Sequence, residues 1–119
     1  MYKSGVDIVE IKRIKNAIKR YGNKFLKRVY SKEEIKYCQN RNNPYPSYAV
    51  RFAAKEAFIK YNNGLKGLRI KDIQIKNDNN GKPFLYVNDR KIKCSVSLSH
   101  SRNNAIAFII GGNNEDLNK

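Results

Sequence analysis

The chain has 119 residues, 40% of them hydrophobic, which suits a single domain with one modest core. It has no run of about 18 apolar residues that would cross a membrane, and its N-terminus lacks the apolar core of a signal peptide. The formal net charge of +15 predicts an acidic partner: nucleic acid, an anionic membrane surface, a phosphorylated ligand or an acidic protein.

Residues 5–21 are predicted to form a helix that ends at Gly22. The apolar residues at helical spacing are Ile8, Ile11, Ile14, Ile18 and Tyr21. Between Lys12 and Arg28 there are eight cations and no acid. This surface is either a solvated face or a docking face for an acidic partner.

A second helix is predicted to begin at Ser31, because Ser31 and Glu34 have the spacing of a capping box. The prolines of residues 41–47 predict a loop. A third helix is expected over 47–62, and Gly64 can adopt the left-handed conformation that ends it.

After Gly64 the apolar period changes from 3.6 to two, which predicts strands. The expected strands are 69–76, 84–87, 91–99 and 105–110, joined by a turn at 77–83 and a hairpin at 100–104. The polar residues 111–119 are expected to fray. Residues 1–119 therefore predict one α+β domain, with N-terminal helices packed on an antiparallel sheet.

The two cysteines, Cys38 and Cys94, are too few for a disulfide framework, so the cytoplasm is the expected compartment. Neither lies in a CxxC or Cys/His cluster, and we expect both to be packing residues.

Three polar residues could carry chemistry. Glu56, in "RFAAKEAFIK", either pairs with Lys60 one helical turn later or holds a hard cation. Asp7, with Glu10 three residues on, fits a helix N-cap. The free amides and dipole of a helix N-terminus would also keep the Asp7 carboxylate ionised, as a Mg²⁺ ligand must be. His100, the only histidine, either makes a local hydrogen bond or joins neighbouring serines in contacting phosphate. The chain has no zinc spacing, Walker loop, GxGxxG or GxSxG motif.

Four segments, "GVDIVEIKRI", "RFAAKEAFIK", "NNGKPFL" and "SLSHS", resemble in sequence and order the holo-[acyl-carrier-protein] synthases, the short bacterial-type 4′-phosphopantetheinyl transferases. The intervening "RVYSKEE" also fits, and the resemblance runs from Gly5 to about Ile110. It implies transfer of 4′-phosphopantetheine from coenzyme A to a serine of apo acyl carrier protein, with release of 3′,5′-ADP, in fatty acid biosynthesis.

The resemblance also implies the site. Asp7 and Glu56 match the family's metal-binding acids, for Mg²⁺ or Mn²⁺, and with Lys60 they would form the catalytic centre. The residues expected to contact coenzyme A are Arg51, Lys55, Lys60, Gly64, Gly81, Lys82, Pro83, Ser99 and His100. The base that takes the serine proton could be Glu56, Lys60 or a metal-bound water, with Glu34 as a weaker candidate.

By the same analogy an acidic acyl carrier protein would dock on the basic first helix and the segment after it. The residues expected to meet it are Arg13, Arg20, Phe25 and Arg28. Members of this family typically form homotrimers with active sites between subunits, and we expect the same here.

Three alternatives compete with this interpretation. A nucleic-acid-binding module would show aromatic residues among cations on an exposed strand face, whereas 91–99 alternates Lys and Ser with aliphatic residues. A transferase serving polyketide or peptide synthase carrier domains would share the fold. A non-catalytic paralogue is disfavoured by the intact Asp7, Glu56 and Lys60. We expect neither a nucleic acid nor a membrane as partner.

Overall fold

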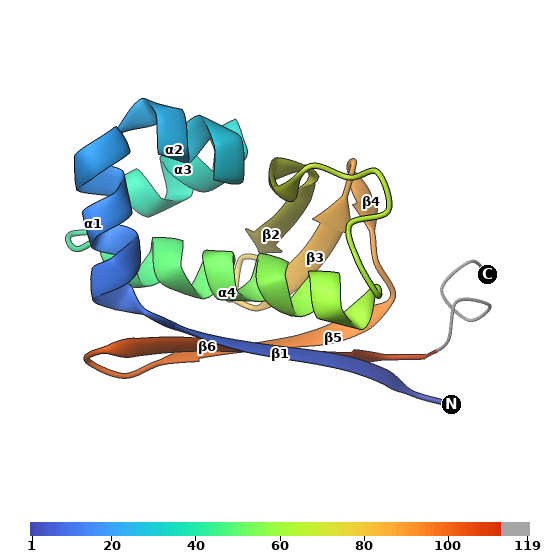
Figure 1. Ribbon diagram of the computed structural model, residues 1–119. Coiled ribbons are helices and arrows are strands. Elements are labelled where there is room, and N and C mark those ends of the chain that lie inside the picture. Colours follow the sequence, from blue (N-terminus) through green and yellow to red (C-terminus); the bar gives the residue numbers. More distant parts are fainter. Residues whose placement is uncertain (113–119) are drawn as a thin grey trace.

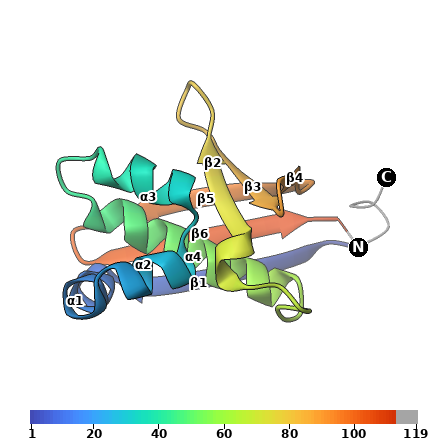
Figure 2. The ribbon, with the colours of Figure 1, turned by 90° about the horizontal axis from the view of Figure 1, so that it is seen from above.

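The computed structural model describes residues 1–112 and contains two three-stranded antiparallel sheets and a long central helix. Helix α4 (Tyr45–Tyr61) lies along one face of the sheet β1–β6–β5, as Figure 1 shows. The second sheet, β2–β3–β4, stands beside the same helix, and Figure 2 shows it from above. The α+β class is therefore confirmed, but two sheets replace the single sheet that was expected.

The predicted helix 5–21 is wrong in its first half. Strand β1 (Lys3–Glu10) comes first and α1 (Ile11–Tyr21) follows it directly. Burial alternates along β1, so Val9 is buried while Ile8 is 63% exposed. The β-branched residues of this segment favour the extended backbone, and pairing with a distant strand decides the outcome.

The first sheet brings the two ends of the chain together. Strand β6 (Asn104–Gly111) lies between β1 and β5 (Cys94–His100) and pairs antiparallel with both. The predicted hairpin at 100–104 is present, where Ser101 N–H donates to Asn104 O at 2.8 Å. Gly111 still pairs with its strand neighbours, so fraying at that residue is not observed. Residues 113–119 lie outside the described residues.

Gly5 sets how closely α4 approaches this sheet. A Cβ atom at Gly5 would lie 1.9 Å from the carbonyl oxygen of Ala57 and 2.9 Å from the backbone nitrogen of Tyr61. Only glycine permits this contact between strand and helix backbones. Small buried side chains, Ala53, Ala54 and Ala57, continue the close packing along the helix. The residues of β1 are thereby held directly against α4.

The second sheet comprises β2 (Ile73–Asn77), β3 (Pro83–Val87) and the short β4 (Arg90–Lys91). A 3-10 turn, Ile70–Asp72, replaces the start of the predicted strand 69–76. The strand predicted at 91–99 is divided, because β4 ends at Lys91 and β5 begins at Cys94. The chain crosses from one sheet to the other at this break.

Three short helices cover one end of α4 (Figure 1). They are α1, α2 (Asn23–Val29) and α3 (Lys32–Gln39). Helix α2 was not predicted: Gly22, at φ +56°, ends α1, and a new helix starts at the next residue. The capping box is confirmed, since Glu34 N–H donates to the Ser31 hydroxyl and Ser31 N–H to the Glu34 carboxylate. No helix within residues 1–112 is long and apolar enough to cross a membrane.

Both cysteines are free thiols in the packed interior, as predicted. Cys38 is buried and Cys94 half-buried, and burial raises the pKa of each thiol to about 11. At neutral pH they therefore stay protonated and unreactive.

Candidate active site

The charged residues of α4 point to two different sides of the helix. Arg51 and Lys55 are buried, whereas Glu56 is half-buried and Lys60 is exposed. At 3.6 residues per turn, Lys60 lies about 180° around the helix from Arg51 and about 14 Å further along its axis. One helix therefore presents two separate charged sites.

The first site joins α4 to the inner face of β1. Lys60 Nζ donates to Asp7 Oδ1 at 3.1 Å and to the carbonyl of Val6 at 2.9 Å. The Lys60 side chain is 57% exposed and that of Asp7 20% exposed, so the pair is open to a ligand. The expected N-cap role of Asp7 is wrong, because Asp7 lies within a strand and Glu10 precedes α1.

Glu56 belongs to the same cluster. Partial burial is the main cause that raises the pKa of Glu56 above its ordinary value, and the Asp7 carboxylate raises it further. Lys60 and Arg13 act in the opposite direction. The surface pair of Glu56 with Lys60 that was one of the two sequence interpretations is not formed, since the Lys60 ammonium binds Asp7 instead. Within residues 1–112, no third acid, histidine or cysteine completes a metal cluster.

Lys55 does not face a ligand site, which contradicts its predicted contact with coenzyme A. Its side chain is fully buried, and the ammonium binds Glu34 Oε1 at 2.7 Å and the carbonyl of Ile73. The Glu34 carboxylate also accepts the backbone N–H groups of Ser31 at 3.0 Å and Ile75 at 3.1 Å. Burial lowers the pKa of Lys55, and the Glu34 carboxylate opposes this shift. The pair ties α3 and β2 to α4 and leaves Glu34 unsuited to act as a base.

The second site is a hollow of about 320 Å³ beside Arg51. Gly81 and Pro83, two of the residues predicted to contact coenzyme A, line it together with Arg51. Asp78 Oδ1 accepts the N–H groups of Asn80 and Lys82, and Gly81 has φ +84°, so this turn requires its Asp and Gly.

The other predicted contacts for coenzyme A do not line this hollow. Lys82 extends over the ring of Phe84 at 5.4 Å. Ser99 and His100 are exposed at the end of β5, where His100 Nδ1 lies 3.2 Å from the carbonyl of Ser101. The left-handed residue after α4 is Asn63, at φ +58°, and not Gly64 as expected, which lies at φ +123°. The structure therefore groups only part of the predicted set.

Sequence reasoning missed the residues that hold Arg51. Asn77 Oδ1 accepts a hydrogen bond from an Arg51 terminal nitrogen at 2.5 Å, and the ring of Tyr37 lies 4.2 Å from the guanidinium carbon. Asn77 is 26 positions from Arg51 and was assigned only to a turn. No local pattern could have paired the two residues.

The basic surface expected to bind a carrier protein is present on α1 and α2. Arg13, Arg20 and Arg28 are exposed, and Phe25 is half-buried with its ring edge-on to Tyr30 at 6.2 Å. Arg13 also lies close enough to Glu56 to influence its titration. The basic surface and the Asp7–Glu56–Lys60 cluster are therefore adjacent.

The alternation of Lys and Ser with aliphatic residues noted for 91–99 does not extend to β3, which carries aromatic residues beside cations. Lys91 Nζ lies 3.8 Å from the centroid of the Phe84 ring, and Lys76 Nζ lies 4.7 Å from that of Tyr86. Both rings are only partly exposed. Because a lysine already covers each ring, neither offers the open face on which a base would stack.

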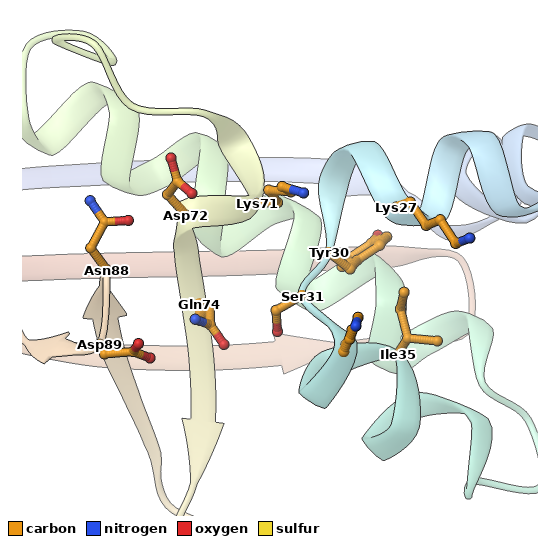
Figure 3. Close-up of a pocket in the computed structure, with 10 residues that line it drawn as sticks. Lys27, Tyr30, Ser31, Ile35, Lys71, Asp72, Gln74, Asn88 and Asp89 are labelled. Atoms are coloured by element: carbon orange, nitrogen blue, oxygen red, sulfur yellow. The ribbon is translucent and has the colours of Figure 1, made fainter.

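A further hollow of about 490 Å³ separates the second sheet from α2 and α3. Figure 3 shows Gln74 on the sheet side and Tyr30, Ser31 and Ile35 on the helix side. The Gln74 side-chain oxygen is buried there without a hydrogen-bond partner among the described residues. None of the residues predicted for the site lines this hollow.

The chain matches the family model of the 4′-phosphopantetheinyl transferase superfamily over residues 3–110. The holo-[acyl-carrier-protein] synthase of Halothermothrix orenii is 43% identical over 117 residues, which cover 90% of this chain and 94% of the relative. That of Thermodesulfovibrio yellowstonii is 42% identical over 106 residues, covering 89% and 94%.

Solved structures of such synthases share the fold. The Bacillus anthracis enzyme, in complex with coenzyme A (3′,5′-ADP), has a TM-score of 0.79 and 30% identity, covering 91% of this chain and 93% of its own. The Helicobacter pylori enzyme, in complex with coenzyme A, has a TM-score of 0.77 and 35% identity, covering 89% and 96%. The chain therefore belongs to the 4′-phosphopantetheinyl transferase superfamily, and within it to the holo-[acyl-carrier-protein] synthases.

Proposed function

We propose that this protein transfers 4′-phosphopantetheine from coenzyme A to a serine hydroxyl of apo acyl carrier protein, releases 3′,5′-ADP and serves fatty acid biosynthesis in the cytoplasm. The observation that carries the proposal is the Asp7–Glu56–Lys60 cluster, in which two carboxylates and an accessible ammonium meet between β1 and α4. Relatives with more than 40% sequence identity are named holo-[acyl-carrier-protein] synthases.

The donor set of the cluster fits Mg²⁺. Asp7 and Glu56 offer hard oxygen ligands, and the effect of Asp7 on the Glu56 pKa shows that the two carboxylates repel each other. Mg²⁺ prefers six oxygens and retains several waters, so two carboxylates are a typical protein contribution. When bound, the ion would neutralise charge on the pyrophosphate oxygens of coenzyme A. Mn²⁺ has the same ligand preference.

The chain's own residues supply the remaining charge and the proton acceptor. Lys60, exposed beside Asp7, is placed to stabilise negative charge that develops on phosphate oxygens during transfer. Glu56 is a candidate base, because burial raises its pKa above the ordinary value, and a carboxylate with a raised pKa is a better proton acceptor. Lys60 and a metal-bound water remain the alternative acceptors.

Arg51 supplies a second phosphate contact from a different surface. Arg51 and Lys60 face opposite sides of α4 and lie about 14 Å apart along its axis, so they belong to two different surfaces of one chain. We therefore propose that each active site combines Asp7, Glu56 and Lys60 of one subunit with the Arg51 hollow of a neighbour in a homotrimer.

An exposed apolar face supports this assembly. The outer side of the sheet β1–β6–β5 carries five apolar side chains that are between 36% and 63% exposed. They are Val6, Ile8, Ile106, Phe108 and Ile110. Contiguous apolar surface of this kind is typical of a protein–protein interface. Contact between copies of this face would bring sites on different chains together.

The carrier protein is expected to bind next to the cluster. Exposed cations of α1 and α2 would attract an acidic carrier and increase its encounter rate by about 10–10³-fold at low ionic strength. Because surface charges are screened, the apparent affinity for the carrier should fall as salt is added.

Intact-mass spectrometry tests the reaction directly. Apo acyl carrier protein, coenzyme A and Mg²⁺ are incubated with the protein, and a parallel sample contains EDTA. We expect one phosphopantetheine to be added to the carrier only when the metal is present. If no carrier protein gains mass, including excised polyketide and peptide synthase carrier domains, transfer is excluded. Modification of those domains alone would replace the fatty acid carrier as substrate.

A further inference from the structure

Arg51 is a buried cation whose partners are all neutral. Only 3% of the residue is exposed. Its guanidinium donates to Asn77 Oδ1 at 2.5 Å and to the carbonyl of Ser47 at 3.4 Å, and it lies against the Tyr37 ring. No carboxylate within residues 1–112 forms an ion pair with it, and its Nε atom is buried without a hydrogen-bond partner.

The charges around Arg51 do not balance. Lys55, one turn further along α4, is also buried and takes the nearby Glu34 carboxylate as its own partner at 2.7 Å. Two buried cations thus share one buried anion. A buried charge without a counter-ion is strongly unfavourable. The surroundings of Arg51 are therefore suited to bind a negatively charged group of a ligand. The hollow beside Arg51 provides the place for it.

We propose that Asn77 is the positioning residue that orients Arg51 for a phosphate group of coenzyme A while leaving its positive charge uncompensated. The inference rests on the proposed function, since it concerns the coenzyme A side of that site. Asn77 performs both tasks through one amide. The oxygen holds the guanidinium, and the nitrogen donates to the carbonyl of Gly81 at 3.0 Å. Gly81 lines the same hollow, so Asn77 fixes two of its walls relative to each other.

The amide is the chemical feature that matters. An aspartate at position 77 would bind the guanidinium with a full negative charge, and Arg51 would then have its counter-ion within the protein. The new carboxylate would also repel an incoming phosphate and could not donate to the Gly81 carbonyl. Asn77→Asp changes almost no volume. It keeps the guanidinium in position but neutralises its charge, so one substitution separates these two properties.

The test compares Asn77→Asp with Asn77→Ala and with the control Asn79→Asp, which places the same charge on an exposed residue of the same turn. Coenzyme A binding is measured by calorimetry, melting temperature by circular dichroism, and KM for each substrate by the mass assay. We expect Asn77→Asp to weaken coenzyme A binding about 10-fold or more, the loss expected when a hydrogen bond to a charged ligand fails. Its melting temperature should equal or exceed that of the wild type, and KM for the carrier protein should not change.

Asn77→Ala retains the charge of Arg51 but releases its position. It should weaken coenzyme A binding about 3-fold or more and lower the melting temperature, whereas Asn79→Asp should bind as the wild type does. Unchanged binding by Asn77→Ala overturns the proposal, as does an equal loss in Asn79→Asp. Should Asn77→Asp fail to fold, Asn77→Ala decides the matter. A wild-type protein that binds coenzyme A without transferring it would refute the proposed function alone.

Discussion

Replacing Lys55 by methionine should destabilise the fold strongly without removing a contact to coenzyme A. Methionine keeps the length of the aliphatic stem but cannot neutralise Glu34. The two side chains are 0% and 1% exposed and 2.7 Å apart, so the variant leaves a carboxylate charged or forces it to bind a proton in the interior. Hydrogen bonds from Ser31 and Ile75 would still hold the carboxylate in place.

The expected loss follows from the burial of the pair. Removing one partner of a buried ion pair costs about 3–5 kcal/mol. Proteins unfold with an entropy of about 2.1 cal/mol/K per residue near 60 °C, which for this chain is about 0.25 kcal/mol/K. The melting temperature of Lys55→Met should therefore fall by about 12–20 °C. Circular dichroism at one fixed protein concentration measures it, since subunit association also contributes to stability.

Two controls separate the buried charge from other effects. Glu33→Gln removes the neighbouring acid, whose exposed contact with Lys76 spans 3.6 Å, and should cost about 1 kcal/mol or less. The double variant Glu34→Gln with Lys55→Met should be more stable than Lys55→Met, because no carboxylate is then left in the interior without its lysine partner. A Lys55→Met protein with the wild-type melting temperature and a raised KM for coenzyme A would refute this account and restore Lys55 as a ligand contact.

Three further outcomes are expected. Glu56→Gln should abolish transfer and the stabilisation by Mg²⁺. Burial and, less strongly, the Asp7 carboxylate raise the Glu56 pKa above 4.5 in the folded state, so ionisation of Glu56 costs stability as the pH rises through that range. In EDTA at pH 8 this variant should therefore melt no lower than the wild type, and a lower melting temperature would contradict the cost of ionising Glu56 in the folded protein. Gly5→Ala should lower the free energy of unfolding by about 3 kcal/mol or more, because the new Cβ would lie 1.9 Å from the Ala57 oxygen. Urea unfolding measures this loss, with Ser4→Ala as a control at an exposed site, and equal midpoints for the two variants would exclude the clash. Phe108→Asp should dissociate the assembly in light scattering and reduce transfer, and an active oligomer of unchanged size would exclude this face as the interface.

Local sequence patterns determined a large part of this structure. The capping box at Ser31, the turn at 77–83 and the hairpin at 100–104 were predictable, because each depends on the backbone preferences of adjacent residues. The central helix was predicted at 47–62 and observed at Tyr45–Tyr61 for the same reason. Resemblance to a family added Asp7 and Glu56 as a pair, although they are far apart in the chain.

Tertiary contacts decided the remainder. Residues 3–10 have apolar side chains that fit both a helix and a strand, and only the availability of β6 as a hydrogen-bonding partner selects the strand. Asp7 consequently meets Lys60 across the sheet–helix contact instead of capping a helix. Lys55 and Arg51 lie on the same helix and carry the same positive charge. Lys55 forms an ion pair with Glu34, whereas Arg51 donates a hydrogen bond to the neutral amide of Asn77. The partners of these two cations on other elements lie 18 to 26 residues away in the sequence. Only folding brings them together, so only the tertiary structure decides which cation stabilises the fold and which is available to a ligand.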